Sequence, residues 1–220
     1  TYLGECLQFK GLFKEAEVEY LKAIDLNPND HRAHFFRASG LQAAGRTNES
    51  IDELVTAFML RPHYPEAIEV LKTTKRKFGV RVDERTFQPR AFVELAGKNV
   101  RLYFPDKESP WMLYAIVKAI WLGEPEFRKS KIGHDRPGFS NIEEIEALSV
   151  LIGSYDTGRA AGKLALDPEL ERLSGIAKQD LLSGFVFYEF GARIFPQVVL
   201  TLPSELQEQV RRYVKKYVLN

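Results

Sequence analysis

The chain has 220 residues, of which 45% are hydrophobic and 28% charged, a composition typical of a globular protein with ample material for a core. The formal net charge of +1 removes the simplest argument for a nucleic-acid or anionic-membrane surface, and no apolar run approaches the roughly 20 residues that span a bilayer. The single cysteine, Cys6, can form no internal disulfide, which fits a reducing, cytoplasmic location.

The first third of the chain contains an internal repeat. Seven positions recur at one constant interval, which matches the period of about 34 residues typical of one class of stacked helical hairpins. The first set is Gly4, Leu7, Gly11, Ala16, Tyr20, Ala23 and Pro28, and the second is Ala38, Leu41, Gly45, Ser50, Leu54, Ala57 and Pro62.

Helices and their ends follow this period. In each unit a glycine, Gly11 or Gly45, marks the turn between two helices, and a proline, Pro28 or Pro62, ends the second helix because it cannot continue one. The second unit runs from about residue 31 to 64, and a third begins at Pro65. We therefore predict one truncated repeat, one complete repeat and one final capping helix that ends at Gly79, with further sequence upstream of residue 1.

These positions resemble the tetratricopeptide repeat family over residues 1–79. The family's early tryptophan is replaced by His34 in the second unit. The resemblance implies a groove, lined by the first helix of each repeat, that receives a peptide of a partner protein. The groove positions implied in this chain are Glu5, Gln8, Phe9, Arg32, Phe35, Ser39, Gln42, Glu66, Glu69, Thr73 and Arg76. The Lys and Asn clamp of the chaperone-tail subfamily is missing, because Glu5, Ser39, Glu66 and Glu69 stand in its place. The alternative is that the short array only packs against the rest of the chain.

Residues 80–220 no longer follow the register of the repeat. Residues 80–89 are polar, end in a proline and predict a linker or docking loop. Two β-branched and aromatic runs then flank a turn-like tetrad, residues 96–99, which predicts a β-hairpin at about 92–104, with a short helix as the alternative.

The remaining pattern predicts helices. Ser109-Pro110 opens a buried helix over 111–122, Ser140 with Glu143 forms a capping box for a helix to about Gly162, and Asp167-Pro168 starts another that continues or kinks into 181–195. A second capping box, Ser204 with Gln207, is predicted to open the last helix. The last helix carries one apolar stripe, and we expect its basic residues to form a solvated outer face: Arg211, Arg212, Lys215 and Lys216.

The motifs of common enzymes are missing. No Cys/His group has zinc spacing, and neither a phosphate-binding glycine loop nor a nucleophile elbow is present, so we expect no metal and no cofactor. The best catalytic candidate is His134-Asp135-Arg136, joined by Asp106, Lys107 and Glu108, but adjacent residues in a Pro/Gly loop are more often solvated. The aromatic run Phe185, Phe187, Tyr188 and Phe190 predicts core packing rather than a ligand pocket.

The sequence thus predicts a mostly α protein: a short helical-hairpin array over 1–79 and a compact helical domain with a β-hairpin over 80–220. The favoured function is a non-enzymatic adaptor that binds a protein or peptide partner, and neither nucleic acid nor a membrane. The alternative is an accessory or regulatory domain of a larger enzyme, in which the second domain binds a small ligand or acts catalytically.

Overall fold

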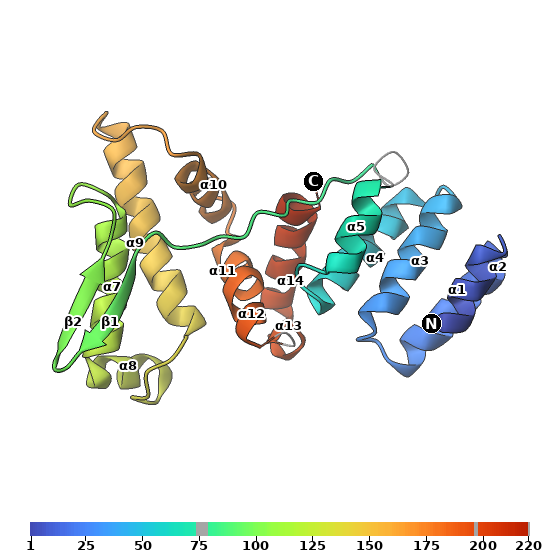
Figure 1. Cartoon of the computed structure of the whole chain (residues 1–220), viewed down its shortest axis with the longest axis horizontal. Helices are drawn as coiled ribbons and strands as arrows, with labels where there is room; N and C mark the ends of the chain where they lie inside the picture. The colour runs from blue at the N-terminus through green and yellow to red at the C-terminus, as the bar shows by residue number, and fades with distance from the viewer. Residues whose placement is uncertain (74–78, 196–197, 220) are drawn as a thin grey trace. The chain divides into compact units, whose positions relative to one another are not determined.

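The computed structural model describes residues 1–73, 79–195 and 198–219, and it is mostly helical with one small antiparallel sheet (Figure 1). The chain folds into two compact units. Unit 1 comprises residues 1–85 and 187–220, and unit 2 comprises residues 86–186. This grouping differs from the predicted division at residue 79/80, because residues 187–220 join the first helices rather than the segment that precedes them.

Unit 1 begins with two helical hairpins whose turns are alike. The first pairs α1 (Tyr2–Phe9) with α2 (Phe13–Leu26), and the second pairs α3 (His31–Ala43) with α4 (Thr47–Leu60). Gly11 and Gly45 adopt φ of 76° and 75°, a left-handed conformation that glycine reaches without a steric cost. In each turn the next residue donates its N–H to the carbonyl five positions earlier, at 3.0 Å for Leu12 and 2.9 Å for Arg46.

The interior of each hairpin depends on a matched pair of residues. Gly4 on α1 lies against Tyr20 on α2, and a Cβ at Gly4 would stand 2.5 Å from the Tyr20 ring. At the equivalent positions of the second hairpin, Ala38 and Leu54 are both fully buried. Compared with the first hairpin, the second has a larger residue on its first helix and a smaller one on its second helix. The volume filled between the two helices therefore stays similar.

The start of the second hairpin follows the predicted turn. Asp30 accepts hydrogen bonds from the backbone N–H groups of Arg32 and Ala33 and so caps α3. A fifth helix, α5 (Pro65–Thr73), begins at the predicted proline; its predicted end at Gly79 lies beyond residues 74–78, which are not described.

The end of the chain completes unit 1. It contains the π-helical turns η1 (Phe187–Gly191) and η2 (Val214–Val218) and the helices α12 (Ala192–Ile194), α13 (Val198–Thr201) and α14 (Ser204–Tyr213). α13, α14 and η2 contact α4, and Asp83 donates its backbone N–H to the Val218 carbonyl at 2.8 Å. These contacts explain why residues separated by more than a hundred positions share one core.

One prediction for the last helix is wrong. Pro203 rather than Ser204 occupies the N-cap, and no side chain caps the helix, so the predicted capping box does not form. The basic face is solvated as expected, with Arg212, Lys215 and Lys216 exposed, and two of its residues also contact α4: Lys215 lies 2.9 Å from Asp52 and Arg211 donates to Thr56 at 3.3 Å. The apolar stripe is confirmed, with Val210, Tyr213, Val214 and Val218 buried.

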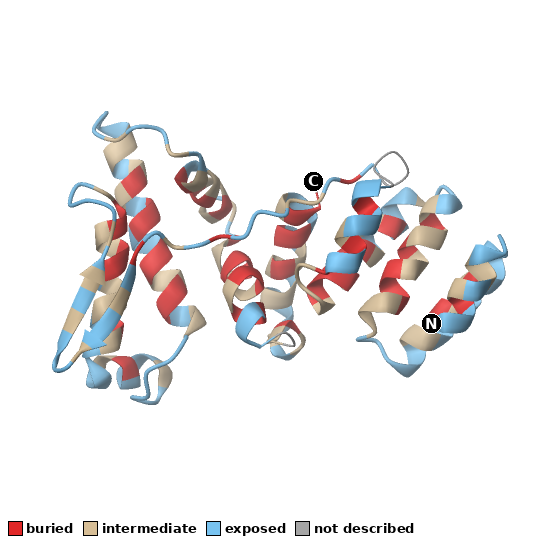
Figure 2. Ribbon diagram, in the orientation of Figure 1, coloured by how far each residue is buried: buried red, intermediate tan, exposed pale blue. Residues whose placement is uncertain are grey.

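Unit 2 contains the predicted β-hairpin. β1 (Phe92–Ala96) pairs antiparallel with β2 (Asn99–Tyr103), in a register that sets Phe92 opposite Tyr103 and Ala96 opposite Asn99. α7 (Trp111–Gly123) packs against both strands and against α9 (Asn141–Ala160), and Figure 2 shows the buried residues along these two helices. The unit is completed by α8 (Pro125–Ile132), α10 (Pro168–Ala177) and α11 (Leu182–Val186). The predicted starts at Ser109-Pro110, Ser140 and Asp167 are confirmed within a residue or two.

None of the helices that the structure describes combines the length and the apolar character needed to cross a bilayer.

Candidate functional site

The predicted groove residues of α1 and α3 lie next to one another. Arg32 donates to the Glu5 carboxylate and to the Tyr2 hydroxyl, both at 3.0 Å, and its guanidinium lies 4.8 Å from the centre of the Tyr2 ring. Gln8 donates to the Ser39 hydroxyl at 3.0 Å. A charged and polar strip therefore runs across the two helices, and Phe9, whose side chain is 96% exposed, stands at the end of α1.

Phe35 is the exception among the groove residues of α3. It is only 3% exposed, and its ring packs edge-on against Tyr64 and Phe36 at 5.6 and 5.5 Å. Packing against other aromatic rings stabilises a buried phenylalanine side chain more than exposure to water does. The prediction that Phe35 presents itself to a partner is therefore wrong.

The groove residues of α5 are exposed and pair locally. Glu66 lies 3.4 Å from Arg61, Glu69 lies 3.0 Å from Lys72, and the Thr73 hydroxyl donates back to the carbonyl of Val70. Gln42, at the end of α3, is half-buried, and Arg76 lies outside the described residues.

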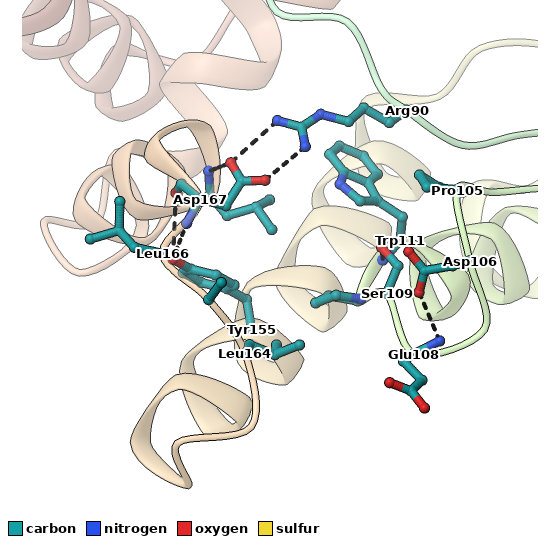
Figure 3. Close-up of a pocket in the computed structure, with 13 residues that line it drawn as sticks. Arg90, Pro105, Asp106, Glu108, Ser109, Trp111, Tyr155, Leu164, Leu166 and Asp167 are labelled. Carbon is teal, nitrogen blue, oxygen red and sulfur yellow. Dashed lines mark hydrogen bonds and ion pairs between the residues drawn. The ribbon is translucent and has the colours of Figure 1, made fainter.

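Unit 2 holds a pocket of about 360 Å³ that the sequence did not predict as one site (Figure 3). It lies between the start of α7 and the segment that joins α9 to α10. Its lining residues, all within unit 2, are Arg90, Pro105, Asp106, Glu108, Ser109, Pro110, Trp111, Tyr155, Leu164, Ala165, Leu166, Asp167 and Leu170.

Local sequence features build one wall of this pocket. Gly162, with φ of 69°, lets the chain leave α9 in a left-handed turn, and the chain then passes over Gly158, where a Cβ would stand 2.5 Å from the Leu164 side chain. Asp167 ends the segment by accepting the backbone N–H groups of Glu169 and Leu170, which caps α10. The wall is therefore fixed at both of its ends.

The same carboxylate anchors Arg90. Two guanidinium nitrogens of Arg90 reach Asp167 at 2.7 and 3.2 Å, and one of them reaches Glu169 at 2.8 Å. Burial alone would raise the pKa of the Asp167 carboxyl, but the bonds from Arg90 and from the Leu170 N–H outweigh it and hold that pKa below its usual range. Arg90 also lies 5.8 Å above the Trp111 ring. The guanidinium is thus held in place on both sides.

Trp111 is the unusual residue of the pocket. It is 1% exposed, and its indole N–H has no hydrogen-bond partner among the described residues. The other tryptophan, Trp121, is equally buried but donates to Glu146 at 2.9 Å. A buried donor is almost always paired in folded proteins, so an unpaired one in the wall of a pocket is an exception that calls for an explanation.

The predicted catalytic cluster does not assemble. Asp106 and Glu108 line the pocket, but His134, Asp135 and Arg136 are exposed in the loop after α8 and do not line it. In that loop Arg128 donates to the Asp135 carbonyl at 2.9 Å. The structure therefore does not bring His134 together with Asp106 or Glu108 as an acid–base pair.

The predicted aromatic run belongs to the core. Phe185 and Tyr188 are fully buried, and Phe185 packs edge-on against Phe87 at 5.3 Å.

Two buried polar clusters were not found from the sequence. In unit 2, Lys118 on α7 lies 2.7 Å from Glu143 and 3.0 Å from Glu144 on α9. In unit 1, Glu189 on η1 is 2% exposed, accepts a hydrogen bond from the Tyr213 hydroxyl at 2.9 Å and lies 3.4 Å from His63. Each cluster joins segments that are far apart in the sequence, so no local sequence pattern indicates it. Within the described parts of the chain, no group of three His, Cys, Asp or Glu side chains is arranged to hold a metal ion.

No protein-family model matches the chain, and neither the curated proteins nor the solved structures include a significant match.

Proposed function

We propose that the chain is a protein-interaction module of the tetratricopeptide kind, and that the α1–α3 face of unit 1 binds an extended peptide of a partner. The proposal is supported by two helical hairpins with equivalent turns at Gly11 and Gly45, one repeat period apart, and by the polar strip that links α1 to α3.

One observation carries the proposal: Arg32 of α3 is held by Glu5 and Tyr2 of α1, and Phe9, at the end of the same helix α1, is 96% exposed. Arginine and aromatic side chains dominate the binding energy of most protein interfaces. A guanidinium held by Glu5 and Tyr2 loses little conformational freedom when a partner carbonyl or carboxylate binds it.

The test is a selection of random displayed peptides against the full chain, followed by affinity measurements on the selected sequences. Arg32→Glu and Phe9→Ala should each weaken the selected peptides by about tenfold or more, because each removes a group that contacts the peptide. Leu26→Ala is the matched control, since Leu26 is 88% exposed on α2 and lies outside the strip. If the selected peptides bind Arg32→Glu and Phe9→Ala as tightly as the unmodified chain, the α1–α3 face is not the binding surface.

A further inference from the structure

Apart from any role of unit 1, we propose that the pocket of unit 2 binds a basic group that carries a neutral carbonyl, as in a lysine or arginine residue of a peptide or in a free basic amino-acid amide. The inference starts from the indole N–H of Trp111. Figure 3 shows the Trp111 ring across the pocket from Tyr155 and Asp167.

The groups around the indole cannot satisfy it. One acidic wall residue, Asp167, already accepts from Arg90 and from two backbone N–H groups of α10. The Tyr155 hydroxyl already bonds Glu171 at 2.9 Å and the Asp167 N–H at 3.1 Å. A phenylalanine would fill the same apolar place without burying a hydrogen-bond donor. The free-energy cost of the unpaired indole N–H is therefore offset only when an acceptor enters the pocket and bonds to it.

The charge of the pocket excludes an anionic acceptor. Among its lining residues, three carboxylates face one guanidinium, and that guanidinium is already neutralised by Asp167 and Glu169. A ligand carboxylate would therefore meet net negative charge. A neutral carbonyl oxygen can accept the indole N–H, and the Ser109 hydroxyl is a further hydrogen-bonding group in the pocket lining.

The position of the cation follows from Asp106. One of its carboxylate oxygens accepts the Glu108 N–H at 3.0 Å, which fixes the side chain at the pocket, and both acidic residues are exposed there. Arg90 already covers one face of the Trp111 ring, so an incoming cation pairs with Asp106 rather than stacking on the indole. The pocket also has an apolar wall, which includes Leu164 and Leu166 and suits the methylene chain of a basic residue.

The experiment uses the full chain, isotope-labelled so that its two tryptophans give two indole N–H signals in a nitrogen–proton correlation spectrum. Trp111→Phe and Trp121→Phe assign the signals. Addition of N-acetyl-lysine N-methylamide should shift the Trp111 signal saturably and leave the Trp121 signal in place, because the Trp121 N–H is already bonded to Glu146. The absence of a saturable shift, or an equal shift of both signals, overturns the proposal.

Two variants, one control variant and two probes separate the parts of the recognition, with affinities measured by calorimetry. Asp106→Asn should weaken the probe about tenfold by removing the charge-assisted contact, while Asp135→Asn, an exposed acid of the same unit outside the pocket, should not change it. Trp111→Phe should also weaken it about tenfold through loss of the N–H. Putrescine has the cation without the carbonyl, and N-acetyl-norleucine N-methylamide has the carbonyl without the cation. If either binds as tightly as the lysine probe, the proposal is wrong.

The source of the basic group is decided by a last comparison. A blocked tripeptide with a central lysine that binds more tightly than lysinamide indicates a peptide ligand, and the reverse order indicates a free small molecule. Either order of affinity is consistent with recognition of a carbonyl and a cation. If neither the tripeptide nor lysinamide binds, the proposal is overturned.

Discussion

Replacing Lys118 by methionine should destabilise unit 2 strongly. The ammonium group lies 2.7 Å from Glu143 and 3.0 Å from Glu144, and the side chains of these three residues are 17%, 8% and 2% exposed. Removal of one partner from a buried ion pair costs about 3–5 kcal/mol, because the other charge stays buried without compensation. Glu144 keeps its hydrogen bond from the Tyr114 hydroxyl, and both carboxylates lie in the first turn of α9, where the helix dipole favours them. We therefore expect a loss near the lower end, about 3 kcal/mol.

Urea denaturation followed by tryptophan fluorescence measures this loss, since Trp111 and Trp121, the two tryptophans of the chain, both lie in unit 2. Lys178→Met is the matched control: its ammonium lies 3.0 Å from Asp156, but the side chain is 68% exposed, so the change should cost at most about 1 kcal/mol. Equal losses for Lys118→Met and Lys178→Met would refute the reasoning from burial.

The pH dependence gives a second check on the same cluster. Burial lowers the pKa of Lys118, but Glu144 and Glu143 outweigh it and raise that pKa above the usual 10.5. A raised lysine pKa stabilises the folded state fully below pH 10.5, and the contribution is lost as the pH rises through the higher folded value. The unmodified chain should therefore lose its advantage over Lys118→Met only in strong alkali.

Three further changes test other parts of the fold. Gly4→Ala sets a Cβ 2.5 Å from the Tyr20 ring, and we expect faster amide hydrogen exchange in α1; adding Tyr20→Leu should slow it again, since the equivalent positions of the second hairpin are an alanine and a leucine. Glu189→Gln removes the negative acceptor of the Tyr213 hydroxyl and should cost about 1–3 kcal/mol, read from hydrogen exchange at residues 187–191; unchanged protection there would contradict the role given to this carboxylate. Asp167 has a lowered pKa, so its contribution to unit 2 is present above pH 3.8 and is lost as the pH falls through the lower folded value; Asp167→Asn should abolish this acid step in the fluorescence titration.

Repeats, caps and the hairpin could be predicted because each depends on residues close in the sequence. The spacing of Gly11 and Gly45 located two turns, and the proline or serine before a helix located the starts of α5, α7 and α9. Two β-branched and aromatic runs about a turn-like tetrad located β1 and β2, whose partners lie close in the sequence. A steric or hydrogen-bonding preference acts over one turn of chain, so the sequence displays it directly.

The candidate sites were predicted only in part. The strip of Arg32, Glu5, Gln8 and Ser39 was expected from the repeat register, but Phe35 was misplaced, since a surface position in the register becomes buried when Tyr64 packs over it. The unit 2 pocket had no local signal, and Asp106 was grouped with the wrong loop.

What the sequence by itself determined is therefore the set of helices, the hairpin and the repeated turns. The tertiary structure alone decided that residues 187–220 complete the unit begun by residues 1–85, and that Arg90, Trp111 and Asp167 meet around one pocket. The physical reason is that burial and charge pairing are satisfied between whichever segments meet in space. A lysine on α7 or a glutamate on η1 looks the same in the sequence whether its partner lies near it, far along the chain, or in water.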